Sequence, residues 1–178
     1  MSDTLKLVKV NGGFNIEFSI VNKSIDLVKI FDFTIMDILY EVNKNDLIDG
    51  YKLDCLEGNI HAQVNFIFKH LFKDIGMPQF YMNMDLCKSQ QENVIIYNCV
   101  KSSNEHPLQN IPVSNYNHNA PINEMNVTCL FPSPSNAVCQ VTILLDHTYG
   151  HLSKYEPMLI SIFKKMFKKV KGFIESSV

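Results

Sequence analysis

The stretch LSKYEPMLISIFKKMFKKVKGFIES, residues 152–176, decides how the rest of the chain can fold. Apolar side chains recur in it every three or four residues, so they share one side of an α-helix. An apolar stripe of this length needs a large partner surface, and the strand-like segments that precede it can supply one. The stripe consists of Leu152, Tyr155, Leu159, Ile162, Phe163, Met166, Val170 and Phe173.

Composition indicates a folded globular protein. The chain has 178 residues, of which 46% are hydrophobic and 19% charged, and its formal net charge is −2. This size fits a single domain over residues 1–178, and the balance of apolar and charged residues argues against disorder. The small net charge gives no global preference for nucleic acid or an anionic membrane. No apolar run approaches the ~20 residues that span a bilayer.

The cysteines indicate a reducing compartment. They are odd in number, widely spaced and without a CxxC pair, and three of them (Cys99, Cys129 and Cys139) lie inside apolar strand-like runs. Unpaired cysteines at apolar, buried positions are typical of intracellular proteins. The first ten residues also lack the apolar core of a signal peptide. We therefore expect a cytoplasmic protein.

The N-terminal third predicts a hairpin followed by a helix. Residues 4–10 and 13–21 alternate like strands, with a tight-turn signal between them. Ser24 is a suitable N-cap, and Asp26 would sit in the first turn, where the helix dipole favours an acidic side chain. The spacing of the apolar residues that follow predicts one helix over 25–43.

The middle of the chain predicts several strands. Short strands are expected at 51–56, 80–86 and 94–100, with residues 89–93 as a turn. The segment 60–75 fits both a strand and a helix, and we favour a strand over 60–69 and a helical turn over 70–75. Residues 101–121, rich in Asn and Pro, predict a long loop.

Two further strands, 122–131 and 137–147, precede the terminal helix. In the second of them one alternating set is wholly apolar, so it should face the core. That set is Cys139, Val141, Ile143 and Leu145.

This order of elements resembles the START-like, or helix-grip, superfamily. The resemblance rests on Phe14–Ile20 leading into Ser24–Ile30, on the hairpin over 122–147 and on the helix over 152–175. It implies an α+β fold in which a curved antiparallel sheet wraps the C-terminal helix and leaves an apolar cavity. A different α+β sheet, such as a saddle-like repeat fold that sits on DNA, is the alternative.

A cavity of this kind would be lined by aromatic and methionine side chains, although the same residues could form an ordinary packed core. The candidates are Phe66, Phe68, Phe80, Met82, Met84, Tyr97, Phe163 and Met166. A ligand cavity should enclose more than ~300 Å³. Phe167 falls off the apolar stripe, among lysines, where it could pack on a partner.

A second candidate surface is the basic side of the terminal helix, which could contact phosphates but more often stays solvated. It comprises Lys164, Lys165, Lys168, Lys169 and Lys171.

Catalytic and metal signals are weak. His147 and His151 beside Asp146 could share a metal on a helix, but Gly150 interrupts the spacing. Cys139 lies in an apolar run that would keep its thiol protonated, so pairing it with His147 gives a poor nucleophile. We expect no metal, no cofactor and no enzymatic activity.

The sequence is therefore compatible with three functions. The first is non-enzymatic binding of a hydrophobic small molecule or lipid between sheet and terminal helix. The second is a structural or protein-interaction domain with a packed core. The third, nucleic-acid binding through the basic helix face, is the least favoured.

Overall fold

The structure, a computed structural model, describes residues 5–103, 117–150 and 152–177. Its helices are α1 (Leu27–Ile30), α2 (Thr34–Asn43) and α3 (Leu152–Ser176), and a 3₁₀ turn, η1, covers Lys73–Ile75. None of the described helices is both long and apolar enough to cross a bilayer. The strands are β1 (Lys6–Val10), β2 (Gly13–Val21), β3 (Ile48–Glu57), β4 (His61–Phe68), β5 (Gln79–Gln91), β6 (Val94–Lys101), β7 (Asn117–Asn119), β8 (Ile122–Ser133) and β9 (Asn136–Leu145).

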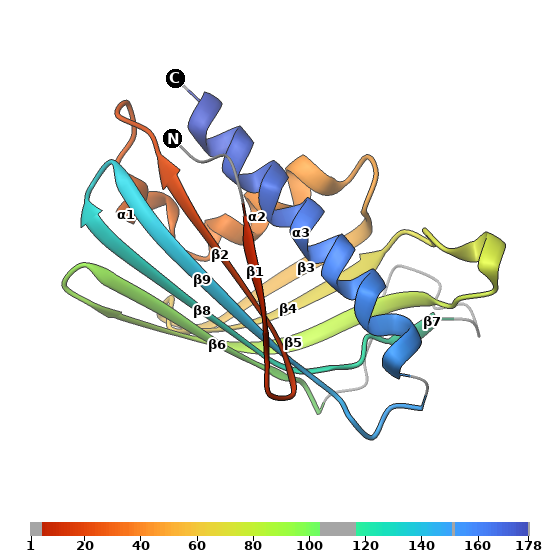
Figure 1. Cartoon of the computed structure of the whole chain (residues 1–178). Helices are drawn as coiled ribbons and strands as arrows, with labels where there is room; N and C mark the ends of the chain where they lie inside the picture. The colour runs from red at the N-terminus through yellow and green to blue at the C-terminus, as the bar shows by residue number, and fades with distance from the viewer. Residues whose placement is uncertain (1–4, 104–116, 151, 178) are drawn as a thin grey trace.

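The strands form one sheet in the order β1-β2-β9-β8-β6-β5-β4-β3, with β7 added beside β5. Every neighbouring pair is antiparallel except β5 with β7. The long α3 crosses the sheet, and α1 and α2 lie near one end of it (Figure 1). The fold is thus α+β, with a sheet covered on one face by helices, as the sequence predicts.

The sheet is strongly curved, and ring contacts of Phe163 demonstrate it. The Phe163 ring lies 6.3 Å from that of Phe14 on β2 and 6.3 Å from that of Phe68 on β4. Four strands separate β2 from β4, so in a flat sheet they would be about 24 Å apart. Both strands reach one ring because the sheet curls around α3.

The two sheet faces differ as the alternation predicts. On β2 the side chains of Phe14, Ile16, Phe18 and Ile20 are buried, and on β9 so is the set Cys139, Val141, Ile143 and Leu145.

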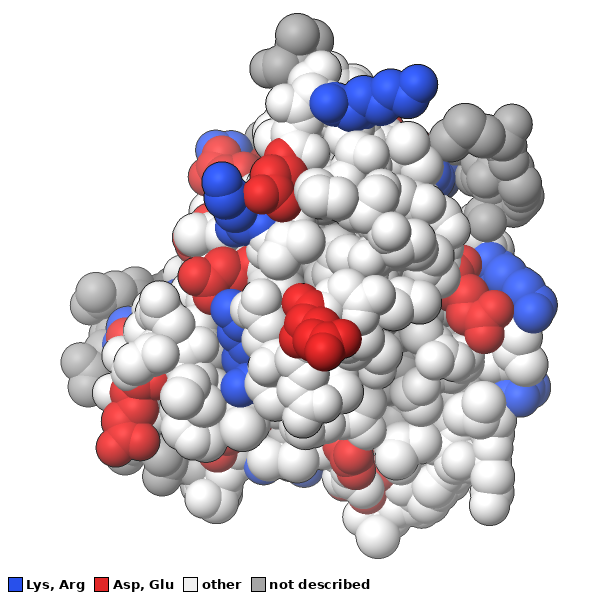
Figure 2. Space-filling model, turned by 90° about the vertical axis from the view of Figure 1, so that its left-hand side faces the viewer, with Lys and Arg blue, Asp and Glu red and all other residues white. Residues whose placement is uncertain are grey.

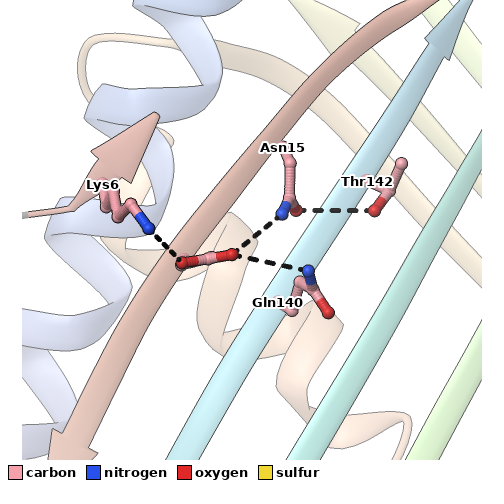
Figure 3. Close-up of polar contacts among 5 residues, drawn as sticks. Lys6, Asn15, Gln140 and Thr142 are labelled. Carbon is pink, nitrogen blue, oxygen red and sulfur yellow. Dashed lines mark hydrogen bonds and ion pairs between the residues drawn. The ribbon is translucent and has the colours of Figure 1, made fainter. Parts of the chain in front are cut away.

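A group of polar side chains lies on the outer face over β1, β2 and β9 (Figure 3). There Glu17 accepts hydrogen bonds from Lys6 (3.3 Å), Asn15 (3.2 Å) and Gln140 (3.5 Å). The Thr142 hydroxyl donates to the Asn15 side chain (3.4 Å). The Lys6–Glu17 contact links the edge strand β1 to β2, and the contacts of Gln140 and Thr142 link β9 to β2.

The strand predictions are largely confirmed, including the strand over 60–69, which is β4. The predicted turn at 89–93 is wrong in extent, because β5 runs to Gln91 and the reversal is confined to Glu92 and Asn93. Glu92 has a positive φ of 43°. Residues 104–116 of the predicted loop lie outside the described residues.

The single helix predicted over 25–43 is wrong, because the segment is divided into α1 and α2. The Asp26 side chain accepts a hydrogen bond from Val28 N (3.2 Å), so Asp26 is the N-cap rather than Ser24. The break buries Phe31 and Phe33, which one straight helix would place on different sides. Packing of these two rings therefore outweighs helical continuity.

The C-terminal helix is confirmed, with two corrections to its apolar face. Phe167 is buried, and its ring stacks on Phe18 (5.7 Å) and Phe163 (6.1 Å), so it is part of the core and not a partner contact. Phe173, by contrast, is 49% exposed, and Ile174 is buried in its place.

Candidate ligand-binding site

A hollow of about 60 Å³ lies between the inner face of the sheet and α3. Its walls come from the sheet, from α3 and from the α1–α2 segment. It is much smaller than the ~300 Å³ expected for a ligand cavity, so the interior is nearly filled.

The sheet supplies the largest share of the wall. Phe66 on β4 and Met82 on β5 are cross-strand partners, and Val127 on β8 and Val141 on β9 are another such pair. The inward-facing alternation brings together side chains that are far apart in sequence. The sheet residues of the wall are Phe18, Ile20, Val64, Phe66, Met82, Tyr97, Met125, Val127, Cys129, Cys139 and Val141.

The terminal helix closes the hollow from the other side. It contributes Phe163, Met166, Phe167 and Val170. Met166 and Phe167 are adjacent, and each lies three or four residues from Phe163 and Val170, so a single helix face supplies all four.

The α1–α2 segment covers the remaining side through Phe31, Ile35, Met36 and Leu39. The buried Tyr97 hydroxyl donates a hydrogen bond to the Phe31 carbonyl oxygen (2.8 Å), which fixes the chain between the two helices. Burial is the main cause that raises the pKa of Tyr97 above its ordinary value, so this hydroxyl stays protonated and uncharged.

Five of the eight side chains predicted to line a cavity do line the hollow: Phe66, Met82, Tyr97, Phe163 and Met166. Phe68, Phe80 and Met84 are buried elsewhere in the core. Phe68 contacts Phe163, and the Phe80 ring packs edge-on against Tyr155 (5.3 Å). Alternation predicts which face a residue occupies but not how far along the strand the hollow lies.

Sequence reasoning missed the residues on β8 and on the α1–α2 segment. Met125, Val127 and Cys129 alternate along β8 opposite the apolar set on β9, and this signal could have identified them. The apolar stripe of the helix predicted over 25–43 includes Phe31 but not Met36, whose inward position depends on the break between the two helices.

The five predicted surface lysines do not form one free patch. Lys165 (2.7 Å) and Lys169 (2.5 Å) both contact the Asp46 carboxylate, and Lys169 also reaches Val42 O. Lys171 is buried, whereas Lys164 and Lys168 are exposed. On the side of the molecule shown in Figure 2, several acidic and basic groups lie next to one another.

The contacts of Asp46 join the end of α2 to α3, and we predict that they contribute weakly to stability. Hydrogen bonds from Lys165 and Lys169 hold the pKa of Asp46 below its ordinary value. The stabilisation is therefore present above pH ~4 and is lost as the pH falls through the lowered pKa. Asp46→Asn should lower the free energy of unfolding by at most about 1 kcal/mol at neutral pH, because the pair is partly solvated.

Urea unfolding of Asp46→Asn and the native protein between pH 3 and pH 7 measures this effect. The two stabilities should converge at the acid end. A difference that persists unchanged to the lowest pH would mean that charge is not the cause. Asp54→Asn is the matched control, because Asp54 pairs with Lys52 within β3 and joins no helices.

The weak metal candidate is not assembled among the described residues. His151 lies outside them, and no three His, Cys, Asp or Glu side chains converge elsewhere in the described part of the chain. Cys139 lies in the wall of the hollow, whereas His147 is exposed beyond the end of β9.

Comparison with known proteins identifies the fold. No protein-family model matches the sequence, and no curated protein matches it. Among solved structures, the human StarD13 (DLC2) lipid transfer and protein localization domain is similar with a TM-score of 0.65 and 7% identity, over 97% of this chain and 79% of that chain. A STAR-related lipid transfer protein fragment from Xanthomonas axonopodis is similar with a TM-score of 0.64 and 10% identity, over 94% of this chain and 90% of that chain. Human StAR-related lipid transfer protein 5 is similar with a TM-score of 0.58 and 11% identity, over 94% of this chain and 86% of that chain.

These similarities extend over nearly the whole chain, at identities that establish shared architecture only. The chain has the START-like, or helix-grip, fold, and the resemblance found in the sequence is confirmed.

Proposed function

We propose that this protein binds a hydrophobic small molecule or lipid between its curved sheet and α3, without catalysing a reaction. The observation that supports this function is the apolar hollow enclosed by the sheet, α3 and the α1–α2 segment. The similar structures named above are lipid transfer proteins or domains by name, which is consistent with such a ligand.

The wall selects for apolar ligands. It carries no charged side chain, and its one hydroxyl, that of Tyr97, is already bonded to Phe31 O. A charged headgroup placed inside would lose its hydration without gaining a partner, whereas a hydrocarbon loses nothing. The buried part of the ligand is therefore expected to be hydrocarbon.

Ligand binding requires the hollow to widen. Four of its wall residues are methionines, whose unbranched side chains adopt several conformations at low energetic cost: Met36, Met82, Met125 and Met166. Rearrangement of these side chains, together with movement of the short α1–α2 segment, can enlarge the space while the sheet stays fixed.

A cavity-filling variant tests the proposal. Val141 and Val138 lie on the same strand, but Val141 lines the hollow and Val138 is exposed on the outer face. Val141→Phe should fill the hollow and weaken binding of a fluorescent fatty acid at least about tenfold, at a folding cost of about 1–3 kcal/mol. Val138→Phe should bind as the native protein does.

Fluorescence titration measures the affinity, and near-ultraviolet circular dichroism verifies that each variant is folded. Equal affinities of folded Val141→Phe and the native protein would place any bound fatty acid outside the hollow. If the native protein binds no fatty acid and native mass spectrometry reveals no co-purified lipid, the proposal fails. The small volume would then favour the second function, a packed interaction domain.

A further inference from the structure

Two cysteines face each other in the wall of the hollow. Cys129 on β8 and Cys139 on β9 are directly opposite in the register, and both line the hollow. They are 0% and 1% exposed.

The backbone hydrogen bonds show what kind of cross-strand pair they form. Leu145 N donates to Gly12 O (2.8 Å), so the backbone groups of Leu145 point towards β2. Backbone direction repeats every second residue, and the β2–β9 register has no irregularity, so the backbone groups of Cys139 also point towards β2.

The same reasoning applies independently to Cys129. Phe131 N donates to Asn93 O (2.8 Å), so Phe131, and with it Cys129, directs its backbone groups towards β6. Cys129 and Cys139 are therefore a non-hydrogen-bonded pair, in which the Cα atoms are about 4.5 Å apart. This separation lies within the range of about 4.4–6.8 Å that disulfides span.

We propose that Cys129 and Cys139 form a dithiol site in the wall of the ligand cavity, and that an apolar hydroperoxide bound there oxidises the pair to a cross-strand disulfide. This inference rests on the proposed function, because the oxidant must enter the hollow as an apolar ligand does.

One thiol sulfur attacks the terminal peroxide oxygen, and an S–O bond forms as the O–O bond breaks. The proton of this thiol passes to the departing alkoxide oxygen, so a sulfenic acid and an alcohol form. The second thiol sulfur attacks the sulfenic sulfur, the S–S bond forms, the S–O bond breaks, and water leaves with the proton of the second thiol. One hydroperoxide is reduced to its alcohol, and two thiols are oxidised to one disulfide.

The surroundings select the oxidant. Glutathione disulfide is charged and hydrogen peroxide is polar throughout, so each loses its full hydration in an apolar wall. An organic hydroperoxide buries mainly hydrocarbon and loses the hydration of one small neutral group. The hydrogen bond with Cys139 and burial raise the pKa of Cys129, so dilute oxidant meets few thiolates there. A hydroperoxide bound beside the pair can react despite the small thiolate fraction, because its local concentration is high.

The test uses the full chain carrying Cys55→Ser and Cys87→Ser, which removes the exposed and half-buried thiols. The protein is treated with cumene hydroperoxide or hydrogen peroxide at equal concentration. Digestion without reduction, followed by mass spectrometry, measures the bond between Cys129 and Cys139. We expect this bond to form at least about tenfold faster with cumene hydroperoxide. Equal rates, or no bond, would overturn the proposal.

Matched variants identify the pair. Cys139→Ala should abolish the bond and leave Cys129 as a thiol or an oxygen adduct. Cys99→Ala, which removes a buried thiol absent from the wall, should leave bond formation unchanged. If Cys139→Ala does not fold, Cys129→Ala serves the same purpose. A bond to Cys99 in place of this pair would contradict the assignment.

Fatty-acid titration of the same samples separates the two proposals. Binding without a disulfide overturns the dithiol site alone, and neither binding nor a disulfide overturns both. A disulfide without binding of any apolar ligand would contradict oxidation through the cavity.

Discussion

Phe163→Ala is expected to lower the free energy of unfolding by about 3–5 kcal/mol. The Phe163 ring is fully buried and contacts Phe14, Phe68 and Phe167, so it joins α3 to strands near both edges of the sheet. Its removal would leave a space that the curved sheet cannot close, because each contacting strand is held by its neighbours.

Phe173→Ala is the matched control. It removes the same side chain from the same helix at a position that is 49% exposed, and should change stability by no more than about 0.5 kcal/mol. Denaturant unfolding of the two variants and the native protein measures both effects. If both variants lose a similarly small free energy of unfolding, the curved sheet does not pack around α3 at Phe163.

The packing of α3 against the curved sheet was predictable from sequence, because it depends on the periodicity of apolar residues. The alternating set ending at Leu145 and the stripe on residues 152–176 each indicate one apolar face, and apolar faces must be buried against each other. Phe167 shows the limit of this reasoning. It lies beside the stripe, and only a sheet that curls around the helix buries so wide a face.

The site was less predictable than the fold. Its position depends on where Met36 and Leu39 enter the interior, and therefore on a helix break that competing tertiary contacts decide. The volume of the hollow depends on how several rotamers fill one space, which no pattern of residue types encodes.

Lys171 illustrates a further limit, since spacing alone placed it with the solvated lysines. Its side chain is only 9% exposed, and its ammonium donates to Ser19 O (2.7 Å) and to the Glu175 carboxylate (2.5 Å). Glu175 in turn accepts a hydrogen bond from Val21 N (3.2 Å). This network attaches the end of α3 to β2, and the Asn22 side chain adds hydrogen bonds to Ile174 O and Ser177 O, both 2.7 Å.

Lys171→Met is expected to lower the free energy of unfolding by about 2–4 kcal/mol. The methionine keeps most of the buried stem, so the loss comes mainly from Glu175 and Ser19 O, which lose a charged donor. Lys164→Met removes an exposed lysine from the same helix and should change stability by less than about 0.5 kcal/mol.

The double variant Lys171→Met/Glu175→Gln identifies the cause. Glutamine still offers an oxygen to Val21 N but carries no charge, so the double variant should regain part of the stability lost in Lys171→Met. Urea unfolding of Lys171→Met, Glu175→Gln and the double variant measures the coupling energy between the two side chains. If the double variant is less stable than Lys171→Met by the full cost of Glu175→Gln alone, the two side chains act independently. The attachment of α3 to β2 would then rest on Asn22 and on apolar packing.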